Sequence, residues 1–479
     1  MEQLSGLDAT FLYCETPTTH LHVCGLILLD PSTMPSGYSF DAISTMVHER
    51  LAQIPSVRQK LVTAPLNLGR PFWVDDEHLD IDRHLHRVVL DPPGDSRSLA
   101  AVTGDIASRP LPRDRPLWEF WVIEGLADGR VAIVVKMHHS TIDGVSGANM
   151  MGHLLDLEPT PPAVDVPEGE HRRGRSPNTI ELLARRWPGR VAEPLELAKL
   201  VPVTAFRMAG TVWRLRHGRD EGATAAARPF TAPRTVFNAT ITARRSVAFT
   251  DVALADVKKV KDAFAVTVND VVTAVIGGAL RRYLEDRHEL PERSLIAAAP
   301  VSVHDQTPEH GGTTKLSVMF STLATDLADP VERLRAIASA NARAKEIHQM
   351  VGADTFMRWA DHFWPNTFAL GARLYSTLHV ADHHPVVHNL ILSNVPGPPI
   401  PLYLAGARLV GLYPLGPIMD GAGLNVTVLS EEDRVGFGVI TCPDLVTEVW
   451  DLVDAIPTAL GELVAATSQV AGAHEPTWR

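Results

Sequence analysis

The chain has 479 residues, of which 45% are hydrophobic and 21% are charged, a composition typical of a globular protein. This length exceeds that of a usual single core and predicts two domains or two closely packed halves. A formal net charge of −12 argues against nucleic acid as a partner. The sequence has no apolar run of 18 residues, no signal-peptide pattern at its start and only three scattered cysteines, so we expect a reduced, cytoplasmic protein.

The first half of the chain, residues 1–160, predicts mixed α/β structure. The spacing of apolar residues predicts helices over 40–53 and 98–109, and residues 131–137 predict a buried strand. Three prolines between positions 159 and 162 end this half.

Residues 161–232 are predicted to be a linker. Several arginines precede an amphipathic stretch over 195–219, and such a basic helix can lie on an anionic lipid surface. The alternative is a helix that packs on the body of the protein through its apolar face.

The second half, residues 233–479, again predicts alternating helices and strands. Asn269 is the expected N-cap of one helix, and Glu432 and Asp433 form the expected turn of a strand pair. The predicted helices cover 251–265, 269–287, 330–350 and 355–378, the last broken at Pro365, and the predicted strands cover 295–303, 316–320, 424–430 and 434–441.

The predicted strand 131–137 leads directly to His138 and His139, which are followed by Asp143 and Gly144. A histidine at a strand end, with a carboxylate four residues later on a tight turn, is a geometry suited to a general base. A hydrogen-bonded histidine without a catalytic role is the plain alternative. A metal site is less favoured because adjacent strand residues point to opposite faces. A serine hydrolase is less favoured because no Gly-x-Ser-x-Gly turn follows a strand.

The pattern His138-His139-x-x-x-Asp143-Gly144 resembles the signature of CoA- and carrier-dependent acyltransferases and condensation domains. With its flanking segments, it is similar to the bacterial wax ester synthase/diacylglycerol acyltransferase family. The similarity covers about residues 1–160 and 230–465. The segments that carry it are 4–9, 115–119, 122–126, 267–271, 300–303, 393–398, 413–417 and 424–427.

The resemblance implies an α/β fold of two chloramphenicol-acetyltransferase-like subdomains, joined by a crossing linker, with a channel between them. It implies transfer of a long-chain acyl group from acyl-CoA to diacylglycerol or a long-chain alcohol. His139 would be the general base, His138 would support the loop, and Asp143 with Gly144 would anchor the turn. Acyl-CoA would be a substrate, with no metal and no bound cofactor, and a membrane or lipid droplet would be a possible partner surface.

The resemblance also implies that Asn269 and Asp270 contact substrate near the channel, and Ser302, at the end of a predicted strand, is a further candidate to contact substrate. Capping is the alternative role for the first two residues, and turn stabilisation for the serine. Three positions depart from the family pattern, namely His304, Thr313 and Glu431. Two rivals remain: a carrier-protein-dependent condensation-type acyltransferase and, because of these departures, a degenerate member that binds lipid without turnover.

Overall fold

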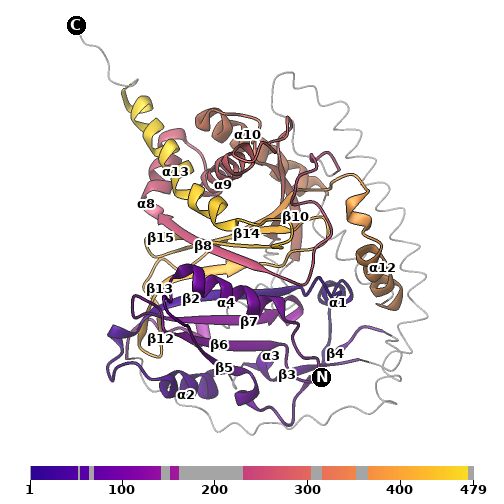
Figure 1. Cartoon of the computed structure of the whole chain (residues 1–479), viewed down its shortest axis with the longest axis vertical. Helices are drawn as coiled ribbons and strands as arrows, with labels where there is room; N and C mark the ends of the chain where they lie inside the picture. Colours follow the sequence, from indigo (N-terminus) through magenta and orange to yellow (C-terminus); the bar gives the residue numbers. More distant parts are fainter. Residues whose placement is uncertain are drawn as a thin grey trace.

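Two six-stranded mixed sheets form the centre of the protein, one above the other in Figure 1. The computed structural model describes residues 2–51, 54–63, 69–141, 152–160, 230–303, 315–351 and 365–472. A third, three-stranded sheet of β1 (Glu2–Gln3), β4 (Phe72–Asp75) and β3 (Gln59–Val62) lies beside the first. The expected mixed α/β class is confirmed.

The first sheet has the order β12-β13-β2-β7-β6-β5. Its pairs are antiparallel except β5 and β6. The strands are β2 (His22–Asp30), β5 (Leu85–Val89), β6 (Trp118–Glu124), β7 (Val131–His138), β12 (Tyr403–Leu404) and β13 (Ala407–Leu415).

The second sheet has the order β10-β9-β11-β14-β15-β8, with β11 parallel to both its neighbours. The predicted strand pair around the turn at Glu432 and Asp433 is confirmed as β14 and β15. The strands are β8 (Ser246–Ala253), β9 (Ile296–Val303), β10 (Lys315–Thr322), β11 (Leu390–Pro396), β14 (Leu424–Glu431) and β15 (Arg434–Thr441).

Helices cover the outer faces of both sheets and the flank between them. Long helices from the second half pack together over the second sheet, around a core that includes Leu280 and Val453. The helices are α1 (Gly6–Tyr13), α2 (Phe40–Leu51), α3 (Pro55–Arg58), α4 (Ser96–Ser108), α8 (Leu254–Phe264), α9 (Val268–Glu285), α10 (Pro330–Val351), α12 (Pro365–Thr377) and α13 (Val449–Gly472), with short 3-10 turns η1 (Pro31–Thr33), η3 (Ile81–Arg83), η4 (His139–Thr141) and η5 (Val380–Asp382).

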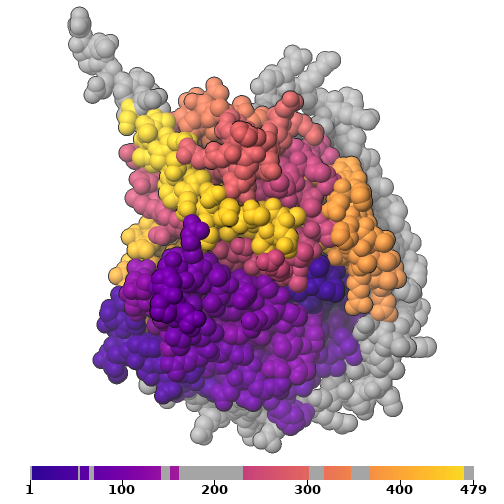
Figure 2. Space-filling model, in the orientation of Figure 1, coloured from indigo at the N-terminus to yellow at the C-terminus, as the bar shows by residue number. Residues whose placement is uncertain are grey.

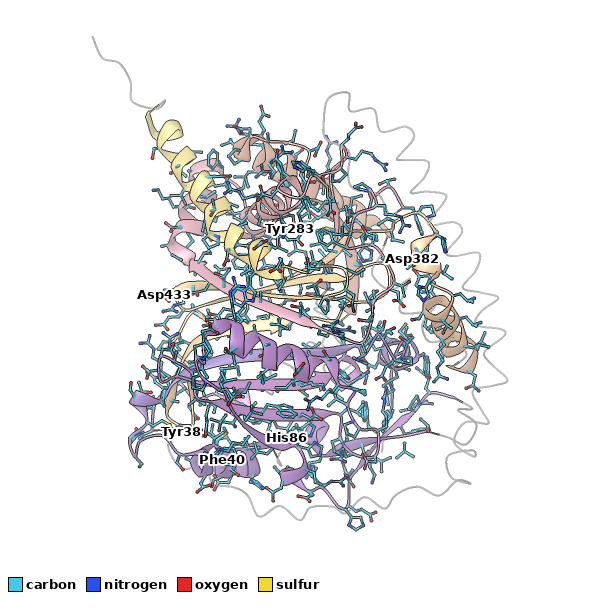
Figure 3. All side chains as sticks on the ribbon, viewed as in Figure 1. Tyr38, Phe40, His86, Tyr283, Asp382 and Asp433 are labelled. Carbon is cyan, nitrogen blue, oxygen red and sulfur yellow. The ribbon has the colours of Figure 1, made fainter. Side chains whose placement is uncertain are left out.

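Side chains of both halves fill their own cores. Tyr38, Phe40 and His86 lie in the lower half of the molecule and Tyr283 in the upper half (Figure 3). Asp433, at the β14–β15 turn, marks one flank of the boundary between the halves, and Asp382 lies on the opposite flank beside α12.

Two strands from the second half of the sequence complete the first sheet. β13 pairs antiparallel with β2, so that Leu415 lies opposite Cys24 and Arg408 opposite Asp30. β12 then pairs with β13 at the edge. The first sheet therefore contains strands from both sides of the predicted linker, which lies mostly outside the described residues.

A shared apolar core joins the two halves. Leu26 and Val134 of the first sheet pack in one buried cluster with Phe249 and Ile440 of the second. Ala132 and Val134 of β7 point into this cluster, while the residues that alternate with them, Ile133 and Val135 among them, point into a separate core on the other face. The halves meet closely over this seam in the space-filling view (Figure 2).

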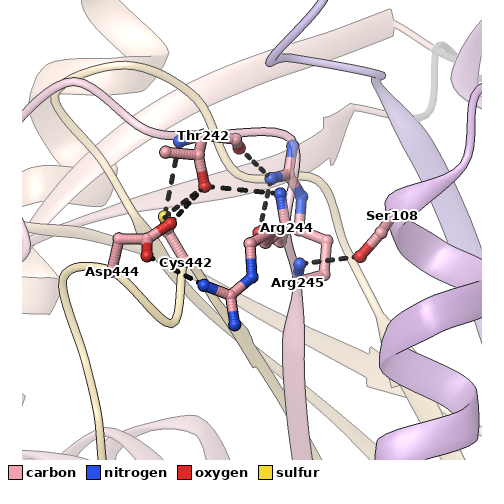
Figure 4. A network of polar contacts seen from close by, with 6 residues as sticks. All are labelled: Ser108, Thr242, Arg244, Arg245, Cys442 and Asp444. Atoms are coloured by element: carbon pink, nitrogen blue, oxygen red, sulfur yellow. Dashed lines mark hydrogen bonds and ion pairs between the residues drawn. The ribbon is translucent and has the colours of Figure 1, made fainter.

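Polar contacts close one edge of the seam (Figure 4). The backbone N–H of Arg245, just before β8, donates to the Ser108 hydroxyl at the end of α4 at 2.8 Å. Arg244 pairs with Asp444 at 3.1 Å, and the N–H of Thr242 donates to Cys442 Sγ at 3.4 Å. These bonds hold the start of β8 against both halves.

Lys136 is a charged residue inside the predicted buried strand, and it is fully buried in β7. Its Nζ donates to the carbonyl oxygens of Ile106 and Arg109 at the end of α4, the first at 2.9 Å, and lies 3.5 Å from Glu119. A cation at a helix C-terminus satisfies carbonyls that the helix leaves unpaired. The charge therefore ties α4 to the strand that carries the histidines.

One predicted boundary is wrong in detail, and one predicted helix is not tested. Residues 251–253 belong to β8, and the helix begins at Leu254, because β8 continues its pairing with β15 as far as Ala253. The segment 195–219 lies outside the described residues, so its amphipathic helix stays a prediction.

We predict that Gly438→Ala destabilises the protein because the new methyl group would meet the backbone of β13. A Cβ at Gly438 of β15 would lie 2.1 Å from the carbonyl oxygen of Pro414. Overpacking typically costs about 1–3 kcal/mol. Gly461→Ala in α13, where a Cβ meets nothing within 4 Å, is the matched control and should be neutral or stabilising. Urea unfolding of both variants tests this; equal midpoints would contradict the close contact.

Candidate active site

The two histidines lie where β7 ends beneath the seam. His138 is the last residue of β7 and pairs in register with His22, the first residue of β2. It lies on the same face of β7 as Lys136, the face directed toward the seam. The backbone N–H of His139 donates to the carbonyl oxygen of Leu21 at 2.9 Å, and η4 begins at that residue.

His138 is buried, with both ring nitrogens facing polar groups. Its Nδ1 accepts the backbone N–H of Ser140 at 3.1 Å, and the Ser140 hydroxyl lies 2.7 Å from the same nitrogen. Its Nε2 lies 3.8 Å from Oε2 of Glu15, and that carboxylate also pairs with Arg113. Burial, reinforced by the positive charge of Arg113, lowers the pKa of His138 well below its usual value. The ring is therefore neutral at pH 7.

His139 keeps a small exposed fraction, but its Nδ1 is buried and an aromatic ring covers the imidazole. Phe11 of α1 stacks on the imidazole with 4.0 Å between ring centroids and 28° between the planes. α1 is fixed at its start by Ser5, whose hydroxyl accepts the N–H of Asp8. Burial lowers the pKa of His139 and its own carbonyl raises it to a smaller extent. A neutral imidazole in this place can accept a proton at pH 7.

Sequence reasoning missed two further histidines beside the pair. His20 and His22 stack on each other at 5.5 Å, and His22 meets His138 edge to face at 5.9 Å. Their alternation at the start of an apolar strand was the signal that could have found them. They line a cavity of about 10 Å³ together with Arg245 and Cys24, which is room for about one water molecule. The wide channel implied by the resemblance stays a prediction.

Ser140 forms a Ser-His-acid arrangement with His138 and Glu15, but with the ring nitrogens exchanged relative to serine hydrolases. In those enzymes the serine bonds to Nε2 and the acid to Nδ1. Here the serine contacts Nδ1, where it shares the nitrogen with its own backbone N–H. Ser140 is also only 4% exposed. The geometry favours a turn-stabilising serine over a nucleophile.

The remaining expected site residues are not all placed beside the histidines. Asp143 and Gly144 lie outside the described residues, so their roles stay predictions. Asp270 accepts hydrogen bonds from the N–H and hydroxyl of Thr267 and, on its other oxygen, from Asn341 at 2.8 Å. These contacts match the capping alternative for this carboxylate.

Asn269 is not the helix N-cap, and that prediction is wrong. Thr267 caps α9, because its hydroxyl accepts the N–H of Asp270 while the aspartate side chain accepts the N–H of Thr267. The side-chain oxygen of Asn269 instead accepts from Asn394 of β11 at 3.2 Å. Among the residues that the structure describes, the side chains of Asn269 and Asp270 bond to Asn394, Thr267 and Asn341 and not to the histidine pair.

Of Ser302 and the three departures from the family pattern, the structure describes Ser302 and Glu431. Ser302 is in β9, opposite Leu316 of β10. His304 and Thr313 fall outside the described residues. Glu431 ends β14, where burial raises its pKa to about 7; the carboxylates of Glu432, Asp251 and Asp433 add to this rise and Arg434 opposes it. None of the contacts described for Glu431 reaches the histidines.

Among the described residues, no group of three or more His, Cys, Asp or Glu side chains is arranged to hold a metal ion. The polar chemistry that the described site offers is proton acceptance by imidazole, supported by a nearby ion pair of Glu15 and Arg113.

Comparisons with known proteins place the chain in a family. The sequence matches the profile of the wax ester synthase/diacylglycerol acyltransferase catalytic domain over residues 4–272 and that of the corresponding C-terminal domain over residues 314–464. A Mycobacterium tuberculosis protein named as a diacylglycerol O-acyltransferase is 42% identical over 465 residues, which is 97% of this chain and 90% of that protein. A second relative from this species with the same designation is 36% identical over 97% of this chain and 99% of its own length.

Solved structures agree with the sequence comparisons. The wax ester synthase/diacylglycerol acyltransferase of Marinobacter aquaeolei VT8 superposes with a TM-score of 0.67 at 29% identity, covering 97% of this chain and all of that one. The first condensation domain of the calcium-dependent antibiotic synthetase superposes with a TM-score of 0.54 at 14% identity, covering 98% and 97%, which shows a shared fold alone. The two-subdomain acyltransferase architecture is thereby confirmed. The chain belongs to the wax ester synthase/diacylglycerol acyltransferase family and is an enzyme of the O-acyltransferase type.

Proposed function

We propose that the protein transfers a long-chain acyl group from acyl-CoA to diacylglycerol or a long-chain alcohol, with His139 as the general base. The observation that carries the proposal is the neutral, Phe11-stacked imidazole of His139 at the end of β7. The names of the relatives support the acceptor class.

In the proposed reaction His139 takes the proton of the acceptor hydroxyl as its oxygen attacks the thioester carbonyl carbon. The C–O bond forms, a tetrahedral oxyanion collapses, and the C–S bond breaks. The imidazolium then returns the proton to the departing thiolate, so that an ester and free CoA leave the enzyme. A positioned base of this kind supplies about 10²–10⁴-fold in rate, and orientation and oxyanion donors supply the rest.

Burial of His139 serves this role because it keeps the base neutral. An imidazolium in the same place would have lost its hydration without gaining a counter-ion, which is why desolvation lowers the pKa. His138, with Nδ1 already occupied by Ser140, is less suited to accept a substrate proton.

Replacing the two histidines separately tests the assignment. We expect His139→Ala to fold and to lose acyl transfer by about 10²-fold or more, since it removes the base. His138→Ala should lose less. His78→Ala, at an exposed position, is the control and should keep wild-type activity. The measurement is release of labelled ester from labelled palmitoyl-CoA with a panel of alcohols and diacylglycerol.

Three results would count against the proposal. His139→Ala with more than about a tenth of wild-type rate would exclude His139 as the base. Transfer only from an acyl carrier protein would favour the condensation-type alternative. Binding of lipid without turnover by the wild-type protein would favour the degenerate alternative.

The pH dependence of kcat/KM should reflect the lowered pKa of His139. A base must be unprotonated, and this imidazole takes up a proton only below its ordinary value of 6.5. Activity should therefore persist as the pH falls through 6.5 and decline at a lower pH, on the acid limb of the profile of the free enzyme. Initial rates from pH 4.5 to 8.5 test this, and an acid limb centred at or above 6.5 would contradict a desolvated base.

We further propose that the enzyme meets its acceptor at a lipid surface. Among the helices that the structure describes, none is by itself long and apolar enough to span a bilayer. α8 and α9 reach the necessary length and apolar character only together, and the pair is bent by 106°. α12, which lies on the outside of the molecule beside α1 (Figure 2), offers another kind of contact.

α12 and the residue that follows it expose an apolar stripe next to α1, which carries Phe11. Leu370, Leu374 and Leu378 are 57%, 48% and 64% exposed and follow each other at intervals of four. The opposite face packs on α1 through Phe368, and residues 365–379 contain no carboxylate. Such a stripe can insert into the boundary between headgroups and acyl chains.

We expect the triple change Leu370→Gln, Leu374→Gln and Leu378→Gln to weaken co-sedimentation with vesicles by at least about tenfold, because burial of each leucine contributes on the order of 1.5–3 kcal/mol when complete. Val89→Gln, which replaces a 63% exposed side chain in β5, is the control. Vesicle binding through the α12 leucines should persist at high salt. Binding lost at high salt would instead favour the arginines of 172–190, which lie outside the described residues.

A further inference from the structure

Glu15 and Arg113 form an ion pair behind the histidines that no mechanism step yet uses. Glu15 follows α1, and Arg113 precedes β6, nearly 100 residues later. The guanidinium and the carboxylate are in direct contact, and the glutamate side chain is only 15% exposed. The same Oε2 atom is the one that lies 3.8 Å from Nε2 of His138.

The two ring nitrogens of His138 face opposite kinds of partner. Nδ1 receives the N–H of Ser140 and must therefore carry a lone pair. The ring proton of the neutral imidazole then sits on Nε2, which is buried and has no other hydrogen-bond partner among the described residues. A carboxylate is the group that an N–H in this position prefers.

The charges around His138 explain why the glutamate needs its arginine. His138 faces Glu15, Arg113, His22 and His139, and Lys136 lies two residues earlier on the same strand face. Arg113 lowers the pKa of His138 and so opposes its protonation. An unpaired Glu15 would do the reverse and favour an imidazolium, whose Nδ1 proton would clash with the N–H of Ser140.

We propose that Glu15 and Arg113 are positioning residues that fix the tautomer and orientation of His138, and through it the turn that presents His139. Orientation passes through the backbone: Ser140 bonds back to His138, so the first turn of η4 is set by this ring. This inference depends on the proposed function for its kinetic test, though its structural test does not.

Removing the negative charge of Glu15 and the positive charge of Arg113 in separate variants distinguishes a positioning role from simple structural support. Glu15→Gln and Arg113→Gln should each lower kcat by about 10–100-fold, as losses of outer partners of a catalytic ring do. Their pH profiles should diverge. In Arg113→Gln the unpaired carboxylate raises the pKa of His138, so the acid limb of the kcat profile moves to higher pH. In Glu15→Gln the acid limb does not move to higher pH.

Arg113→Lys keeps the charge and should keep the wild-type acid limb even if Glu15→Gln fails to fold. Asp114→Asn is the matched control, because Asp114 pairs with Arg83 in an exposed contact at the surface. It should leave both kcat and the pH profile unchanged.

Spectra of protein labelled with 15N-histidine provide the readout that does not require activity. We expect His138 to be protonated on Nε2 in the wild type and to lose that single tautomer in Glu15→Gln. Wild-type His138 with its proton on Nδ1, or variants whose acid limbs and tautomer are unchanged, would overturn the proposal. An inactive wild-type enzyme with the expected tautomer would instead count against the proposed function alone.

Discussion

The close contact of β13 with β15 is the constraint on which the rest of the structure depends. β13 is paired with β2 in the first sheet, yet it lies beyond β8 to β11 in the chain. The glycines of β15 let its backbone approach β13 so closely that a Cβ at Gly436 would meet the carbonyl of Leu412 at 2.5 Å. The halves therefore share a buried cluster between their sheets, and the end of β7 lies beneath it.

Much of this fold could be predicted from periodicity. The apolar spacing placed α2, α4, α10 and the β14–β15 pair close to their observed bounds, since each buries one regular face. Periodicity indicates that a segment is a strand but not which strand it pairs with. The pairing of β12 and β13 within the first sheet could therefore not be predicted from it. The cap of α9 fell on Thr267 because a reciprocal bond to Asp270 outweighs the choice of Asn269.

The residues of the candidate site likewise differ in how far the sequence predicts them. His138 and His139 were predictable because a strand end and a short motif mark them in one stretch of sequence. Phe11, Glu15 and Arg113 reach them from remote segments, without any repeating pattern of their own. Burial then sets the chemistry: desolvation keeps both imidazoles neutral, which suits one as a base and lets the other serve as a hydrogen-bonded support.

The central claim is direct attack of the acceptor alcohol on the thioester, assisted by His139, and its most direct test omits the acceptor. Purified protein is mixed with acyl-labelled CoA thioester alone, quenched in acid over milliseconds to minutes, and examined for free CoA and for label bound to protein. The account predicts neither a stoichiometric burst of CoA nor covalent label, and prompt CoA release once an alcohol is added. A burst with the acyl group on Ser140, the hydroxyl 2.7 Å from His138, would contradict it.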